Sequence, residues 1–454
     1  MLSHKQASVF LFLEGFASVA IQFLILRQIT PFVGSSVIIV SIVISLFLAA
    51  LALGYHRGGL VTQRHTEILA RNLFVAAGIL GIFGSYVFVA GIYRTFNHTD
   101  AIVLLLGYLL FVMVPVVYLV AQTIPILVNS MSAETAGKKT GDALLFSTVG
   151  NVFGGILTTV VIMYYLGVSW ALVFTVAILF TLSIVISEHK KNALILFAVL
   201  FPLIVMLNIG FGKYFFVAET AYANYRVKEE KGNRYFLANK SHSSKIDTKS
   251  KEGYAYLEKI KKIIAGYAPY MKDPNILVLG AGGFTLTADD TLKIPVHYVD
   301  IDNQIKEIAE KYFLKEKIKG TFSGEDARVF LRGITQKYSF ILVDAYSNQK
   351  SIPGNLTSVE FYREVSTQLK SDGLMITNII MDPFLSDNFS KRMDNTIRAS
   401  FRSCFRDVVQ AWPGSGNILY ICTNIKQAIA STTNTIYRDN NNKSTVDYFK
   451  DRVQ

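Results

Sequence analysis

The stretch NILVLGAGGFTLTADDTLKIPVHYVDID, residues 275–302, decides how the C-terminal half of the chain folds. Its apolar run 276–279 is closed by the glycine-rich turn 280–283, which indicates a buried parallel strand entering a tight turn. We expect a short helix from Phe284 and then a second strand, 296–299, which ends on Asp300. This βαβ spacing is typical of a nucleoside site, where Gly280 and Gly282 let a ligand approach the backbone and Asp300 accepts hydrogen bonds from ribose hydroxyls. Dinucleotide enzymes and S-adenosylmethionine enzymes share such a turn, and many such turns only connect two elements.

The first half of the chain is too apolar for an ordinary soluble protein. The whole chain is 51% hydrophobic with a mean hydropathy of +0.37, and residues 1–212 hold only 10 of its 45 Lys and Arg residues. Because a span needs about 20 apolar residues, we predict a seven-helix membrane domain in residues 1–212, with the lipid bilayer as its partner. The first span holds Glu14 and is followed at once by another, so it is not a cleaved signal peptide. The predicted spans are 7–26, 33–54, 72–93, 101–128, 143–166, 169–187 and 193–211.

Glu14 is the one acidic residue well inside a predicted span. A charge in that position is costly, which makes it a candidate for a transport or sensing role. The alternative is a structural glutamate that ties the first helix to a neighbour through Gln122 or Asn151. No span carries an arginine ladder, a paired-carboxylate motif or a histidine cluster.

The loop charges predict an orientation. Eight basic residues fall on the side of the N-terminus and three on the other side, so the positive-inside rule places the N-terminus in the cytoplasm. With seven spans the C-terminal domain would lie outside. Adenosyl cofactors are made in the cytosol, and for that reason we lean towards a cytoplasmic domain in a bacterial-type inner membrane.

The second half alternates strands and helices. A β-hairpin is expected within 219–247, in a subdomain over residues 213–250. We predict that residues 251–430 form a Rossmann-like, S-adenosylmethionine-methyltransferase-like domain. The expected parallel sheet ends in an antiparallel hairpin, which is typical of such domains and not of an NAD domain. We expect a turn at 371–373, and the tail 431–454 is polar and predicted to be poorly ordered. The expected helices are 251–267, 303–315, 357–370 and 386–402, and the seven strands are 276–279, 296–299, 320–323, 338–343, 374–379, 405–411 and 418–423.

The sequence holds only two cysteines, Cys404 and Cys422, on facing arms of the final hairpin. We predict two buried free thiols, because a domain with its own core does not need a disulfide. No CxxC pair or zinc set is present, so no metal is expected. No basic stripe is interleaved with stacking aromatics, so nucleic acid is not an expected partner.

Residues 219–423 resemble the membrane-anchored branch of the spermidine synthase-like (polyamine aminopropyltransferase) family. The resemblance implies that Gly280 and Gly282 line the cofactor turn and that Asp300 binds the ribose. It makes Asp326, with Ala327 beside it, the partner of the adenine amino group, and it makes Asp344 the catalytic aspartate. Three further residues would bind the substrate, and the segments 351–353 and 356–357 resemble a gate loop. Those substrate-binding residues are Tyr254, Tyr346 and Ser347.

The chemistry of amine transfer agrees with this role for Asp344. An amine that attacks a carbon next to a sulfonium must first lose a proton from its ammonium form, whose pKa is about 10, so a carboxylate is needed as acceptor. Asp344 follows the predicted strand 338–343 at the carboxyl edge of the sheet. For Asp300, Asp326 and Asp344 the alternative is a helix cap or a loop hydrogen bond.

Two departures from the family pattern concern the acceptor. Family members that use a diamine carry aspartates where this chain has Gly283 and Ser347. Without those carboxylates a buried dication would lack partners, and Phe284 and Tyr346 are expected to make the pocket more apolar. We therefore expect an intact cofactor half and a weakened polyamine half of the site.

Three functions remain open at this stage. The first is transfer of an aminopropyl group from decarboxylated S-adenosylmethionine to an amine. The second is methyl transfer from S-adenosylmethionine to another nucleophile presented at the membrane. The third is a protein that only senses nucleosides or polyamines. A second copy of the chain is a further expected partner.

Overall fold

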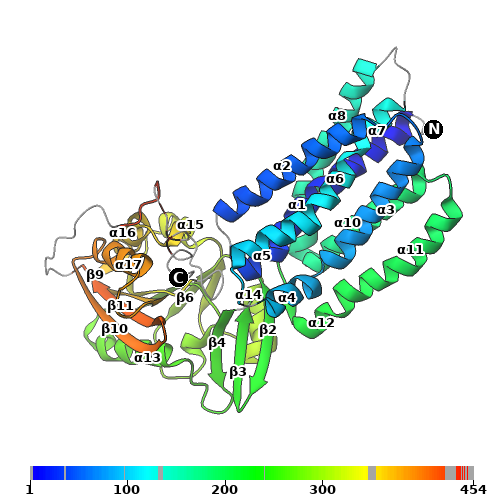
Figure 1. The fold of residues 1–454 in the computed structure, drawn as a ribbon. Helices are drawn as coiled ribbons and strands as arrows, with labels where there is room; N and C mark the ends of the chain where they lie inside the picture. Colours follow the sequence, from blue (N-terminus) through cyan, green and yellow to red (C-terminus); the bar gives the residue numbers. More distant parts are fainter. Residues whose placement is uncertain are drawn as a thin grey trace. The chain divides into compact units, whose positions relative to one another are not determined.

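The structure, a computed structural model, divides into two compact units that meet in sequence at residues 221 and 222 (Figure 1). Each unit is described by itself. The residues described are 4–34, 37–96, 98–130, 136–239, 241–345, 354–424 and 436–440, together with 442, 444 and 447.

The first unit is built from apolar helices. Seven helical stretches within its described residues are long and apolar enough to cross a membrane, the number expected from the sequence. The third predicted span, 72–93, is broken in two at Gly84 and Ser85, where the Ser85 side chain accepts a hydrogen bond from the Phe88 amide and caps the next helix. The helices are α1 (His4–Val33), α2 (Val37–Gly59), α3 (His65–Phe83), α4 (Tyr86–Thr95), α5 (Ala101–Tyr108), the π-helix η1 (Leu109–Met113), α6 (Val114–Ala121), α7 (Thr123–Asn129), α8 (Ala136–Ile156), the π-helix η3 (Leu157–Met163), α9 (Tyr164–Leu166), α10 (Val168–Ile186), α11 (Lys190–Val205), the π-helix η4 (Met206–Gly210) and α12 (Gly212–Phe215).

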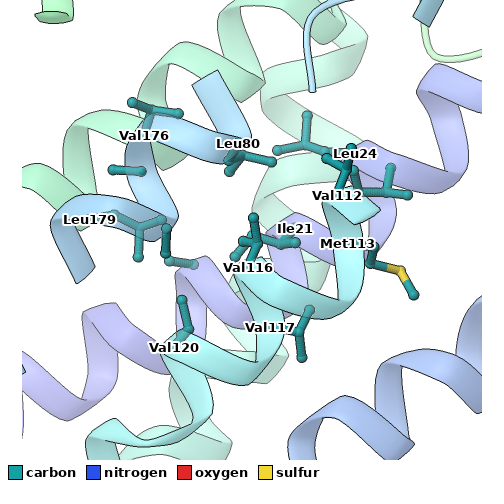
Figure 2. Packing of buried hydrophobic residues seen from close by; sticks show 14 of the residues in the cluster. Ile21, Leu24, Leu80, Val112, Met113, Val116, Val117, Val120, Val176 and Leu179 are labelled. Carbon is teal, nitrogen blue, oxygen red and sulfur yellow. The ribbon is translucent and has the colours of Figure 1, made fainter. Parts of the chain in front are cut away.

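The core of this unit lies between α1, α3, η1, α6 and α10. Figure 2 shows the interdigitated side chains, which are small, branched and fully or almost fully buried. They come from helices far apart in sequence, so the unit has one contiguous core. The residues labelled there are Ile21, Leu24, Leu80, Val112, Met113, Val116, Val117, Val120, Val176 and Leu179.

Helices α1 and α8 touch through their backbones along a strip that we call the glycine seam, made of Gly15, Gly150 and Gly154. A Cβ atom added at Gly15 would lie 2.0 Å from the carbonyl oxygen of Ser147. At Gly150 and Gly154 it would lie 2.0 and 2.4 Å from carbonyl oxygens of α1. Only glycine allows this approach, which is how small residues pack membrane-type helices.

Glu14 lies beside the glycine seam and is 2% exposed. Its Oε2 accepts a hydrogen bond from Ser147 Oγ of α8 at 3.0 Å. The sequence-based expectation of a tie between helices is thus correct, but the expected partners are wrong. Gln122 instead accepts from Asn72 Nδ2 at 3.0 Å, because both amides lie in the interface of α3 with α6.

A small antiparallel sheet opens the second unit. Strands β2 (Asn224–Glu230), β3 (Asn233–Ala238) and β4 (Ser241–Asp247) pair in sequence order, and the turn between β2 and β3 falls at Lys231 and Gly232. The expected hairpin is confirmed and gains a third strand. The two-residue strand β1 (Ala218–Glu219) precedes it.

The large sheet confirms the seven-stranded, methyltransferase-like Rossmann prediction. Its strand order is β10-β11-β9-β8-β5-β6-β7, with parallel pairing from β9 to β7 and an antiparallel β9–β11–β10 end. β5 and β8 are buried along their whole lengths, as continuous apolar runs in central parallel strands should be. The strands are β5 (Ile276–Leu279), β6 (Val296–Asp300), β7 (Thr321–Gly324), β8 (Tyr338–Val343), β9 (Leu369–Met381), β10 (Ser403–Trp412) and β11 (Ser415–Thr423).

The helices of this domain differ from the sequence prediction in places. The helix expected from Phe284 is a single 3-10 turn, and the turn expected at 371–373 lies inside β9. There β9 bulges, because Leu369 pairs with Tyr338 while Leu374 pairs with Phe340. The helices are α13 (Ala255–Tyr267), η5 (Ala268–Tyr270), η6 (Thr285–Thr287), α14 (Ile305–Ile308), the π-helix η7 (Ala309–Leu314), α15 (Ala327–Gly333), η8 (Gly354–Leu356), α16 (Val359–Thr367) and α17 (Asn388–Arg398).

The cysteine prediction is wrong. Cys404 and Cys422 form a disulfide bond, with Cα atoms 4.1 Å apart. The two residues are directly opposite each other in the register of β10 and β11. The register brings the two sulfurs together. The prediction placed the two residues on facing arms but could not know that they are directly opposite, and it rested on the domain having a core of its own.

The expectation of a poorly ordered tail is also wrong for its described part. Tyr437 is fully buried and Ser444 is 3% exposed. Tyr437, an aromatic residue within a polar segment, could have indicated burial. The prediction used the composition of the whole segment and not this single residue.

Candidate active site

The glycine turn after β5 is enclosed on two sides. Gly280 has φ +95° and Gly282 has φ +51°, a region that favours glycine. A Cβ atom at Gly280 would lie 2.5 Å from the backbone oxygen of Asp344, and one at Gly282 would lie 2.9 Å from Ser244 Oγ. The turn therefore runs between the end of β8 and strand β4, with no room for a side chain at Gly280 or Gly282.

Asp300 lies at the end of β6 against the same turn. Its Oδ2 accepts from the Ala281 amide at 2.9 Å, and its Oδ1 accepts from the Asp302 amide at 3.0 Å. Burial raises the pKa of Asp300 to about 6, although these backbone hydrogen bonds favour the charged form. The carboxylate thus fixes the turn through backbone amides of the turn itself and of the chain after β6.

Asp302 ties the small sheet to this region. It is 1% exposed, and its Oδ2 accepts from the hydroxyl of Tyr225 in β2 at 2.7 Å. Gly283 N donates to Ser244 Oγ of β4 at 2.8 Å. The small sheet therefore forms one wall of the glycine turn.

Asp326 caps a helix, which is the alternative role expected for it from the sequence. Its Oδ1 accepts from the amides of Arg328 and Val329 at 2.8 and 3.2 Å, which caps α15. Its Oδ2 has no hydrogen-bond partner among the described residues. Ala327 is the first residue of α15 and is half-buried. The role of both residues towards adenine stays a prediction.

Asp344 follows β8 and receives two side-chain donors. Tyr256 Oη donates to its Oδ2 at 2.8 Å, and Asn378 Nδ2 of β9 lies 3.4 Å from its Oδ1. Burial raises the pKa of Asp344 to about 6, while these two hydrogen bonds act in the opposite direction. A carboxylate with such a pKa is still ionised at neutral pH but is a better proton acceptor than an exposed one.

The tyrosine that contacts Asp344 is Tyr256, a residue that the sequence did not single out; the role of Tyr254 in substrate binding stays a prediction. Tyr254 stacks on Tyr256 with ring centroids 6.1 Å apart, and Lys245 Nζ lies 5.8 Å from the Tyr254 ring centroid. Tyr256 is the residue that reaches Asp344. The signal that could have separated them is the helix start, because α13 begins at Ala255 and places Tyr256 in its first turn.

Phe284 does not make the pocket apolar as expected. It is 1% exposed, and its ring packs in the core against Tyr298 and Phe322 at centroid distances of 4.9 and 5.6 Å. Gly283 is also confined, because a Cβ atom there would lie 2.4 Å from a ring carbon of Phe313.

The other residues predicted to meet the acceptor follow Asp344 in the chain. Tyr346, Ser347 and the segment 351–353 lie outside the described residues. Leu356 and Thr357, at the end of the gate-like stretch, are buried. Among the described residues no group of three or more His, Cys, Asp or Glu side chains is placed to hold a metal ion.

Comparison with known proteins identifies a domain and relatives of the chain. Residues 253–434 match the spermine/spermidine synthase domain. The chain is 24% identical over 417 residues to polyamine aminopropyltransferase 2 of Aquifex aeolicus (strain VF5), covering 84% of this chain and 79% of that protein. It is 28% identical over 166 residues to a probable polyamine aminopropyl transferase of Bifidobacterium longum (strain NCC 2705), covering 33% of this chain and 37% of that protein.

Solved structures resemble the second unit more loosely. A probable spermidine synthase from Corynebacterium glutamicum ATCC 13032 has 18% identity and a TM-score of 0.40, covering 47% of this chain and 81% of that one. A spermidine synthase from Thermotoga maritima has 13% identity and a TM-score of 0.33, covering 49% and 85%. On the strength of the domain match and the two sequence relatives, the C-terminal domain is a transferase domain that belongs to the spermidine synthase-like family.

Proposed function

We propose that the second unit transfers an aminopropyl group from decarboxylated S-adenosylmethionine to an amine. The observation that carries this proposal is the contact between two halves of one site: Asp344, held by Tyr256, lies directly against the glycine turn that Asp300 fixes. A glycine-rich turn between a first parallel strand and an acid at the end of the next strand is typical of a nucleoside site. The family of the domain supports the reaction class.

The residues suggest the following chemistry. The amine nitrogen attacks the propyl carbon bonded to the sulfonium, the carbon–sulfur bond breaks, and its electron pair leaves with the sulfur of methylthioadenosine. Asp344 accepts the proton that the amine gives up. Tyr256 and Asn378 donate to its two oxygens and so hold the carboxylate in one orientation.

Methyl transfer is the second candidate, and one observation favours it. The site lacks the carboxylate that diamine-using relatives are expected to have at position 283, and the Phe313 ring occupies the adjoining space. A less highly charged nucleophile, presented at a membrane, would not need that carboxylate.

The product decides between these candidates. We expect purified full-length protein in detergent to release methylthioadenosine from decarboxylated S-adenosylmethionine when supplied with a panel of amines. Release of S-adenosylhomocysteine from S-adenosylmethionine, without methylthioadenosine, would instead establish methyl transfer. If neither product forms although methylthioadenosine binds in a calorimetric titration, the domain is a nucleoside sensor and not an enzyme.

We infer that the first unit anchors the protein in a membrane and that the second unit faces away from the cytoplasm, which reverses the cytoplasmic placement expected from the site of adenosyl cofactor synthesis. The seven apolar helices support the first point. The loop charges and the Cys404–Cys422 disulfide support the second point, because disulfides are rare in the cytosol.

This orientation is tested by a reporter fused after Gln454. We expect activity from a reporter that works only outside the cytoplasm and none from one that works only inside. The opposite result would place the domain in the cytoplasm, where adenosyl compounds are made. In that case we expect Cys404 and Cys422 to be free thiols in cells whose thiols are trapped before lysis.

A further inference from the structure

The strands β9, β11 and β10 extend past the level of the candidate catalytic carboxylate. Asn378 of β9 lies against Asp344, and Met381 follows three residues further along the same strand. Since a strand rises about 3.3 Å per residue, Met381 lies about 10 Å beyond Asn378 at the carboxyl edge of the sheet. The register pairs Met381 with Gly416 of β11, and Gly416 with Ala411 of β10, so the three strands reach this edge together.

Two short segments continue beyond this row of residues, and we call them together the aromatic tip. They are residues 382–386, which follow β9, and residues 411–415, where β10 turns into β11. Each segment exposes one large aromatic side chain, because Phe384 is 88% exposed and Trp412 is 40% exposed. Both β9 and β10 pair antiparallel with β11 and therefore run in the same direction. The two aromatic residues thus lie at the carboxyl edge, the edge at which β8 ends on Asp344.

The turn that carries Phe384 is fixed by the side chain of Asp382. This side chain is buried, its Oδ1 accepts from the Phe384 amide at 3.1 Å, and its Oδ2 accepts from the Ser386 amide at 2.7 Å. The Asp382 amide in turn donates to Ser390 Oγ of α17 at 2.9 Å. Leu385 has a φ of +56° and packs against the core of the unit. The backbone therefore holds Phe384 outwards, and its exposure is built into the turn.

The aromatic tip presents no charged side chain to its surroundings. Asp382 is the only charged residue in either segment, and it is buried against backbone amides. A charge is the costly part of bringing a protein surface into a bilayer, and this surface has none to bring. Apart from Ser386, the exposed residues of the tip are Phe384, Ala411, Trp412, Pro413 and Gly414.

The shape and size of the aromatic tip favour a lipid surface over other occupants. Small-molecule sites are concave and enclose their ligand, whereas the tip projects beyond the row of paired residues. A stable protein interface buries about 1,200 Å² or more, which two side chains cannot supply. Tryptophan and other aromatic residues are favoured at the boundary between water and lipid. The same chain carries seven helices long and apolar enough to cross a membrane, so a bilayer is available to the tip at high effective concentration.

We propose that the aromatic tip is a membrane contact of the second unit, in which Phe384 and Trp412 enter the headgroup region of a bilayer. The contact turns the carboxyl edge of the sheet, and with it the site at Asp344, towards the lipid. An acceptor would then approach the site from the bilayer surface. That consequence rests on the proposed transfer function, whereas the contact itself does not depend on which group the domain transfers.

The chain has two tryptophans, Trp170 and Trp412, so each can be observed alone. Trp170→Phe leaves only Trp412, and Trp412→Phe leaves only Trp170, which lies in α10 of the first unit. Both full-length variants are reconstituted into phosphatidylcholine liposomes with and without brominated acyl chains, which quench tryptophan fluorescence at close range. We expect brominated lipid to quench both tryptophans. Quenching of Trp170 alone would overturn the tip proposal and leave the membrane anchor in place, and quenching of neither would overturn both.

Phe384→Ser and Tyr270→Ser, each combined with Trp170→Phe, form a matched pair. Both residues are 88% exposed, but Tyr270 lies in η5 before β5, at the opposite edge of the sheet. Phe384→Ser should shift the balance between bound and free tip by about 10-fold, because one aromatic side chain no longer leaves water. The quenching of Trp412 should fall accordingly, and Tyr270→Ser should leave it unchanged.

Two results would contradict the proposal. Equal quenching of Trp412 in the two serine variants would mean that Phe384 takes no part in a lipid contact. If brominated lipid leaves Trp412 unquenched while its emission changes with protein concentration in detergent, the tip meets a second copy of the chain and not a bilayer.

Discussion

Asp344→Asn should lower the rate of transfer by about 10²–10⁴-fold, the usual contribution of a positioned proton acceptor. Asparagine keeps the shape of the side chain but cannot take the proton from the amine. It also accepts at only one of the two positions to which Tyr256 and Asn378 now donate. The measurement is the initial rate of methylthioadenosine release with decarboxylated S-adenosylmethionine, beside a titration with methylthioadenosine, whose affinity should be nearly unchanged. A variant that keeps its rate would remove Asp344 from the mechanism.

Tyr256→Phe and Tyr254→Phe form the matched pair of controls for this prediction. In the wild-type protein the rate should rise as pH rises through about 6, the raised pKa of Asp344, because only the ionised carboxylate accepts a proton. The hydrogen bond from Tyr256 stabilises that ionised form and lowers the pKa, so its removal should raise the pKa and move the acid limb of the pH–rate profile to higher pH. Tyr254→Phe removes no hydrogen bond to Asp344 and should leave the limb in place. An acid limb that does not respond to Tyr256→Phe would mean that another group controls it.

Gly283→Asp should destabilise the protein and fail to restore the use of putrescine. The backbone of Gly283 does not have a positive φ, so conformation is not the obstacle. The obstacle is the Phe313 ring, fully buried in η7, with a ring carbon 2.4 Å from where the new Cβ would lie. Overpacking of this kind typically costs about 1–3 kcal/mol. Thermal unfolding and the rate of spermidine formation measure the two effects.

Gly283→Ala is the control for charge, because it meets the same ring without a carboxylate. We expect it to lose about as much stability as Gly283→Asp. Gly333→Asp controls for the change from glycine to aspartate, since a Cβ at Gly333 meets no atom within 4 Å. If Gly283→Asp were as stable as wild type and made spermidine rapidly, the ring would have to move aside and the pocket would accept a diamine.

The sequence predicted best where the signal is local. The apolar runs of β5 and β8, the glycine turn and the acid that ends β6 are each readable within a few residues, and together they lead to the correct sheet. The contact of Tyr256 with Asp344 was not predicted, because it depends on where α13 starts, and helix ends are the least predictable feature of a helix.

The errors concern contacts between distant residues. Phe313 meets Gly283 across thirty residues, through a π-helical segment that no periodicity reveals. The disulfide depends on the register of β10 against β11, and the burial of Tyr437 depends on its contacts with α16 and α17. Each is a tertiary contact that composition cannot report.

The glycine seam limits what the helical unit can do. A carrier works by letting one group of helices rock away from another, and the surfaces that part are then covered by water, substrate or lipid. Where α1 and α8 face each other, their surfaces are bare backbone at three glycines. Beside these glycines, Glu14 accepts a hydrogen bond from Ser147. If the two helices separated, lipid acyl chains would be too bulky to fill the narrow gap between the glycines. Separation would also expose the carboxyl group of Glu14 to hydrocarbon. We therefore expect these two helices to move together as one pair, and any solute pathway through the unit would have to leave their contact intact.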